Sequence, residues 1–174
     1  MLGQLIDKSF DALHFVGHSV YQDRRRPPRA GWLFSDDTYL SASELNRLDR
    51  VPEFVFSNSC SSGVLSDPQR WIGSAPTLAS TFFARGVGNF VCTAWPIDDG
   101  VGSEFARVFY SKVLGLELRD SEWQRAPRQP MSEAMRMARI AVANTRGGRR
   151  IWGAYQHYGN PHSRLLPMSS SSDE

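Results

Sequence analysis

Two short segments decide the fold of this chain, LHFVGHS at residues 13–19 and FVFSNSCSSG at residues 54–63. Each is an apolar run followed by small polar residues, which is the pattern of a buried parallel strand and its exit loop. His18 and Cys60 then fall at two strand ends. Because ligands bind outside the carboxyl ends of the strands in open α/β sheets, neighbouring strands could place an imidazole beside a thiol. An imidazole and a thiol together are the equipment of a cysteine hydrolase.

The other segments alternate between strand and helix patterns. The sequence predicts strands at 12–16, 53–57, 89–95 and 151–159, a hairpin at 31–41, and helices at 43–48, 76–84, 103–114 and 132–144. Residues 116–130 show neither pattern and are expected to be irregular. Strands that alternate with helices predict an α/β fold, a three-layer sandwich around a mostly parallel sheet.

The length of 174 residues fits one domain, which we expect over residues 1–161, with a disordered tail at 162–174 that contains a serine run. Two cysteines are too few for a disulfide framework and fit a reducing cytoplasm. No apolar stretch approaches the roughly 18 residues of a membrane span. We therefore expect a cytoplasmic protein with no membrane partner.

The net charge of +2 conceals an excess of arginine over lysine. We interpret this as compositional bias, so no nucleic-acid partner is expected. The one dense cluster of arginines, at residues 24–29, is interrupted by Pro27 and Pro28. These prolines exclude a regular helix or a central strand there. The cluster is interpreted as a solvated loop, and the alternative is a loop that gates substrate or binds a partner.

The two cysteines have different surroundings. Small polar residues surround Cys60, so its thiolate could be solvent-reachable and reactive, whereas Cys92 lies inside an apolar strand and is expected to be a buried structural thiol. His18 follows Gly17, which permits a close approach by a substrate backbone. The histidines and cysteines lack metal-ligand spacing, so no metal is predicted.

Two other chemistries fit the sequence poorly. The segment VGHSV would make Ser19 the nucleophile of a G-x-S-x-G elbow, but Tyr21 occupies the position of the second glycine. A nucleotide-binding fold would need a glycine-rich phosphate loop, and neither G-x-G-x-x-G nor a Walker motif is present.

The ordered words HFVGHS, SNSCSSG, ARGVGNFVCTAWPIDD, FARVFY, EAMRMAR and IWGAYQHYGNP resemble the CHAT family of caspase-like cysteine peptidases, which are related to separases and often fused to tetratricopeptide repeats. The resemblance covers residues 10–161. It implies a caspase-like fold and a cysteine endopeptidase that cleaves a protein or peptide substrate without a cofactor.

By this resemblance His18 matches the catalytic histidine and Cys60 the catalytic cysteine. The backbone N–H groups of Cys60 and Ser19 would then stabilise the tetrahedral oxyanion. Asp99, and next Asp98, match an aspartate that binds an arginine before the scissile bond in separases, which would favour cleavage after a basic residue. The alternative is that either aspartate caps the following helix.

The chain departs from the family pattern before His18. Caspase-like domains usually place a β-α-β unit before the histidine strand, and residues 1–11 leave room only for a piece of helix. No regulatory repeat domain is recognised within these 174 residues. Two readings remain: a peptidase, completed if necessary by a partner chain or regulatory domain, and a catalytically inactive caspase-like interaction module or fragment.

Overall fold

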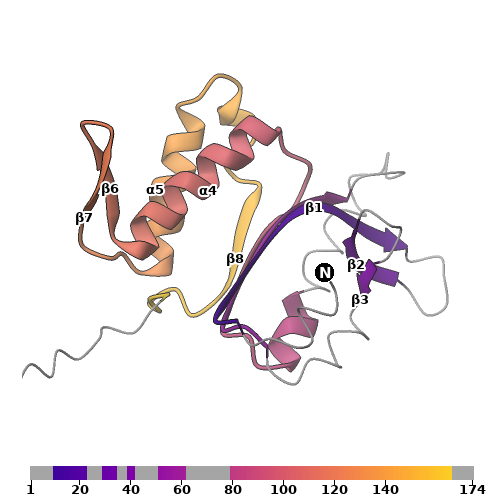
Figure 1. The fold of residues 1–174 in the computed structure, drawn as a ribbon. Helices are drawn as coiled ribbons and strands as arrows, with labels where there is room; N and C mark the ends of the chain where they lie inside the picture. Colours follow the sequence, from indigo (N-terminus) through magenta and orange to yellow (C-terminus); the bar gives the residue numbers. More distant parts are fainter. Residues whose placement is uncertain (1–9, 23–28, 35–38, 42–50, 62–78, 166–174) are drawn as a thin grey trace, which may run out of the picture. The chain divides into compact units, whose positions relative to one another are not determined.

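The computed structural model describes residues 10–22, 29–34, 39–41, 51–61 and 79–165 (Figure 1). The chain divides into two compact units. The first comprises Met1–Asp98 and Gly153–Gly159, and the second comprises Asp99–Trp152 and Asn160–Glu174. The histidine segment at 13–19 and the cysteine segment at 54–63 both belong to the first unit.

Six strands of the first unit form one sheet within the described residues. They are β1 (Ala12–Gln22), β2 (Arg29–Leu33), β3 (Tyr39–Ser41), β4 (Phe54–Ser61), β5 (Asn89–Thr93) and β8 (Tyr155–Gly159), in the order β3-β2-β1-β4-β5-β8. The central strands β1, β4 and β5 run parallel. Strands β2, β3 and β8 pair antiparallel with their neighbours. The expected α/β fold, with a sheet that is parallel at its centre, is confirmed.

A cluster of buried aromatic and aliphatic side chains joins strands β1, β2, β4 and β5 to the helical residues 79–84. Trp32 lies at its centre, stacked on Phe15 with ring centroids 4.5 Å apart and tilted against Phe82 at 5.3 Å. Every residue of β5 is buried, as expected for a central strand with apolar side chains. Apolar burial of this kind is the main driving force for folding.

The strands differ in length from those that the sequence predicts. β1 does not end at Val16 but continues to Gln22, because residues 18–22 pair with β2. β4 likewise extends to Ser61, so Cys60 lies inside a strand and not in an exit loop. The predicted hairpin at 31–41 is confirmed by the antiparallel pairing of β2 with β3. Its turn, the predicted helix at 43–48 and residues 24–28 of the arginine cluster lie outside the described residues, whereas Arg29 is the first residue of β2.

In the described part of the second unit, two α-helices pack against each other. They are α4 (Asp99–Leu114) and α5 (Met131–Ala143). The apolar stripe of α4 includes Phe105, Phe109 and Val113, all fully buried. α4 ends at Leu114, as its predicted range does, and Gly115 follows with φ +68°. The predicted start of α4 at Ser103 is wrong by one turn, since Asp99–Gly102 form its first turn.

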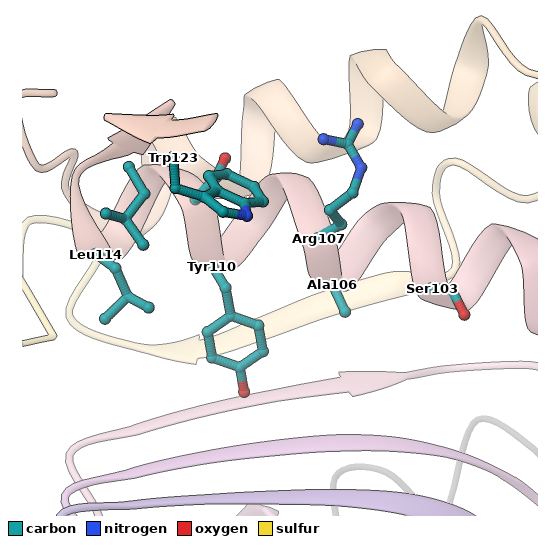
Figure 2. A pocket seen from close by; sticks show the side chains of 8 residues that line it. Ser103, Ala106, Arg107, Tyr110, Leu114 and Trp123 are labelled. Carbon is teal, nitrogen blue, oxygen red and sulfur yellow. The ribbon is translucent and has the colours of Figure 1, made fainter. Parts of the chain in front are cut away.

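The prediction that residues 116–130 are irregular is wrong in part. Strands β6 (Leu116–Arg119) and β7 (Glu122–Arg125) form an antiparallel hairpin. Its two turn residues, Asp120 and Ser121, both have positive φ, as a type I′ turn requires. The side chains of α4, β6 and β7 line a pocket of about 350 Å³, which Trp123 and Tyr110 border (Figure 2).

The predicted final strand at 151–159 is too long. Residues Gly148–Arg150 form a 3₁₀ turn, η1, and the Trp152 N–H donates to Gly148 O at 2.8 Å. Strand β8 therefore begins only at Tyr155. In the predicted tail, Ser163 O accepts a hydrogen bond of 3.0 Å from Met131 N. No helix within the described residues is long and apolar enough to cross a membrane.

Candidate active site

The histidine and cysteine segments form one parallel ladder. It runs from Ala12 opposite Phe54 to Ser19 opposite Ser61, and in this register His18 is the partner of Cys60. Adjacent strands lie about 4.8 Å apart, so the two backbones are within one strand spacing of each other. The structure thus brings together the two residues that the sequence predicts as a catalytic pair.

His18 is accessible to solvent on one face of the sheet. The exposed residues of β1 include His18 and Val16, which is 68% exposed, whereas Phe15 and Ser19 in the opposite phase are buried. Positions 58 and 60 of β4 share the phase of positions 16 and 18 across the ladder. A molecule arriving from solvent can therefore reach His18 on the sheet face that positions 16 and 18 of β1 share with positions 58 and 60 of β4.

Ser19, the predicted second source of an oxyanion N–H, lies deeper in the sheet. It is 4% exposed and is the register partner of Trp32 on β2 as well as of Ser61 on β4. A backbone N–H between two paired strands faces one of them. The Ser19 N–H can therefore bind an oxyanion only if it does not donate to a carbonyl of the neighbouring strand.

Strand β4 extends beyond its neighbour β5 at the end that carries Cys60. The β4–β5 ladder stops at Ser57 opposite Cys92. Just past this point the hydroxyl of Thr93, the last residue of β5, donates to the backbone carbonyl of Ser59 at 2.9 Å. A side chain thus continues the hydrogen bonding where backbone pairing ends.

Further side chains hold the residues before Cys60 from both faces. The indole N–H of Trp32 donates to Ser57 Oγ at 2.8 Å, and Ser57 Oγ lies 2.8 Å from Ser59 Oγ. The Tyr155 hydroxyl donates to Asn58 Oδ1 at 2.9 Å. Burial raises the pKa of Tyr155, so its hydroxyl remains a neutral donor.

Sequence reasoning missed this set of hydrogen bonds. Its donors come from β2, β5 and β8, which are remote from one another in the chain. The small polar residues of the segment SNS were visible in the sequence, but nothing local indicated which side chains would meet them.

The second cysteine is chemically inert in the fold. Cys92 is 4% exposed, and burial raises the pKa of its thiol to about 12. At neutral pH its thiolate, which is the nucleophilic form, is essentially absent. This agrees with its prediction as a buried structural thiol.

The two candidate specificity residues lie at the start of α4. Asp99 is its first residue, Asp98 immediately precedes it, and both are exposed. The position of Asp98 is the one where aspartate is favoured as a helix cap. The boundary between the two units falls between these residues.

The described residues contain no group of three or more His, Cys, Asp or Glu side chains arranged to hold a metal ion. Comparison with curated proteins and with solved structures gave no match. A family model for the CHAT domain matches residues 2–160, which include the strands of both chemical segments and all of α4 and α5. The CHAT family is caspase-like and related to cysteine peptidases. Since the match spans nearly the whole chain, the protein belongs to the CHAT domain family.

Proposed function

We propose that this protein is a cysteine endopeptidase in which Cys60 is the nucleophile and His18 its acid–base partner. The observation that carries the proposal is the register of the β1–β4 ladder, in which the two residues are direct partners on parallel strands. The exposure of His18 supports it further, because the site must admit a polypeptide.

The reaction needs only groups that the chain supplies. The Cys60 thiolate attacks the scissile carbonyl carbon, and the tetrahedral intermediate collapses with cleavage of the C–N bond. His18 donates a proton to the departing amine. It then takes a proton from a water molecule as the water attacks the thioester, and the intermediate collapses to release the new carboxylic acid and regenerate the Cys60 thiolate. The backbone N–H groups of Cys60 and Ser19 would bind the oxyanion, each once it is released from the strand ladder in which its residue pairs.

The substrate would be a protein or peptide. Asp99, with Asp98 second, would favour a basic residue before the cleaved bond, because a carboxylate accepts two hydrogen bonds from a guanidinium. A regulatory repeat domain would control the peptidase, or a partner chain would complete its domain. The presence of only two cysteines supports a cytoplasmic setting.

Incubation with a proteome-derived peptide library, read by mass spectrometry, tests this function. The wild type and Cys92→Ala should produce the same new peptide termini, and Cys60→Ala should produce none. Equal cleavage by wild type and Cys60→Ala would overturn the proposal. Absence of cleavage by folded wild type would instead favour the interaction module.

A further inference from the structure

The two backbone N–H groups that the family resemblance assigns to the oxyanion both lie within the β1–β4 ladder. At the start of this ladder the Phe54 N–H donates to Asp11 O at 3.2 Å. Because alternate residues of a strand face the same neighbour, the N–H of Cys60 also faces β1. By the same alternation the N–H of Ser19 faces β4. A side chain could supply a donor without breaking this ladder.

Asn58 carries an amide on the sheet face that bears His18. Positions 58 and 60 of β4 share the phase of positions 16 and 18 of β1, so Asn58 stands on that face two residues before Cys60. Two residues of a strand span about 6.6 Å, a distance that the Asn58 side chain and a substrate carbonyl bound at position 60 can cover between them. Asn58 is only partly buried, so a substrate on this face can reach it.

The hydrogen bond from Tyr155 decides which end of the Asn58 amide is available. The Tyr155 hydroxyl donates to Asn58 Oδ1 at 2.9 Å, and Tyr155 is itself fully buried in β8. The acceptor end of the amide is therefore held by the protein. Its other end, the Nδ2 atom with two N–H donors, has no partner within the described residues. Asn58 thus offers donors, which suit an oxygen acceptor that gains negative charge.

We propose that Asn58 is a catalytic residue, whose side-chain N–H binds the oxyanion of the tetrahedral intermediate formed at Cys60. The proposal rests on the proposed function, in which Cys60 attacks a carbonyl carbon. Asparagine amides form oxyanion holes in acyl transfer, where loss of one such donor slows the reaction about 100- to 1,000-fold. Tyr155 is then a positioning residue, because it holds the amide without touching the substrate.

Two reactions of Cys60 separate oxyanion binding from the general reactivity of the thiol. Acylation by p-nitrophenyl acetate passes through a tetrahedral oxyanion, whereas alkylation by iodoacetamide needs the thiolate but forms no oxyanion. Both are followed on the purified chain by intact mass, with Cys60→Ala as the blank. The measured quantity is the ratio of the acylation rate to the alkylation rate, in which changes in the amount of thiolate cancel.

Two variants remove the donors in different ways. Asn58→Asp keeps the shape and the oxygen that accepts from Tyr155, but replaces the N–H donors by a second oxygen. Asn58→Leu would leave the buried Tyr155 hydroxyl without its acceptor, so it is combined with Tyr155→Phe. Tyr155→Phe alone is the reference for this double variant. Urea denaturation verifies that each variant is folded.

Asn89→Ala is the matched control. The Asn89 Oδ1 atom also lies 3.0 Å from a side chain of β8, at His157 Nε2, but Asn89 pairs with Phe54 at the opposite end of β4. We expect the ratio to fall about tenfold or more in Asn58→Asp relative to wild type, and in the double variant relative to Tyr155→Phe. In Asn89→Ala the ratio should stay within about twofold of wild type.

An unchanged ratio in either Asn58 variant would overturn the proposal, as would an equal fall in Asn89→Ala. Failure of the proposed function is recognised in other arms of the experiment. There the wild type would not be acylated at Cys60, or His18→Ala would be acylated at the wild-type rate, and the role of Asn58 would fall with it.

Discussion

Trp32 on β2 donates its indole N–H to the hydroxyl of Ser57 on β4 at 2.8 Å, although β1 lies between these two strands in the sheet. The indole also stacks on Phe15 of β1 in nearly parallel orientation, at 9°. One buried side chain therefore ties the β2–β3 hairpin to both strands of the candidate catalytic pair.

Replacement of Trp32 should show how much these contacts contribute to the free energy of unfolding. Trp32 is 1% exposed, so Trp32→Phe removes the hydrogen bond and leaves unfilled volume beside Ser57. We expect the free energy of unfolding to fall by about 2 kcal/mol, as measured by urea denaturation. The same substitution at Trp152, which is 49% exposed, should change it by less than about 0.5 kcal/mol. Equal effects at the two sites would contradict the assigned role.

The two readings of Asp98 and Asp99 can be separated by substitution with asparagine. Asparagine caps helices as well as aspartate does but carries no charge. If Asp99 binds a basic side chain, Asp99→Asn should raise KM for arginine-containing peptides, with a smaller effect for Asp98→Asn and unchanged stability. If both residues only cap α4, neither variant should alter the preference for arginine over a neutral residue.

The buried thiol of Cys92 should make stability depend on alkaline pH. Its folded-state pKa is about 12, against an ordinary value of 9.0. Above pH 9 the unfolded chain releases this proton and the folded chain retains it, so the free energy of unfolding falls as pH rises. The contribution reaches about 1.4 kcal/mol by pH 10.

Urea denaturation at pH 8 and pH 10 checks this dependence, with Cys60→Ala as the background so that Cys92 is the only thiol. Adding Cys92→Ala should lower stability at pH 8 and reduce the loss between the two pH values by about 1.4 kcal/mol. A loss of equal size with and without Cys92 would contradict the assignment.

The adjacent glycines after α5 should respond differently to alanine. A Cβ at Gly148 would collide with the backbone carbonyl of Val142, whereas a Cβ at Gly147 would meet open space. Gly147 has φ +83°, so Gly147→Ala carries only the left-handed backbone penalty, about 1 kcal/mol. Gly148→Ala should cost at least about 1 kcal/mol more by urea denaturation. A smaller loss for Gly148→Ala than for Gly147→Ala would show that the turn rearranges freely.

The parts of the fold that the sequence predicts well are those in which burial follows a local pattern. The apolar runs at 13–16, 54–57 and 89–93 all lie in strands of the sheet, and the apolar stripe of α5 locates that helix within one residue at each end. Gly115, with positive φ, stops α4 as glycine is expected to do, whereas Asn144 caps the end of α5 and Gly147 precedes the 3₁₀ turn η1.

The features that the sequence could not predict depend on distant pairing. Strand β7 has Trp123 as its single apolar residue and so shows no apolar alternation that would pair it with β6. The last residues of β1 form a strand because β2 pairs with them. The hydrogen bond from the Thr93 hydroxyl to the Ser59 carbonyl joins two strands that are distant in the sequence, so it could not be predicted from either segment alone. The proximity of His18 and Cys60 followed from strand order, whereas their chemical roles remain predictions.

The central claim, that Cys60 and His18 act together, is tested most directly by intact-mass labelling with a peptidyl electrophile that carries arginine at its reactive end. We predict a single label on the wild type, which persists in Cys92→Ala, disappears in Cys60→Ala and forms more slowly in His18→Ala. Labelling that survives Cys60→Ala, or that proceeds at the wild-type rate in His18→Ala, would contradict the claim.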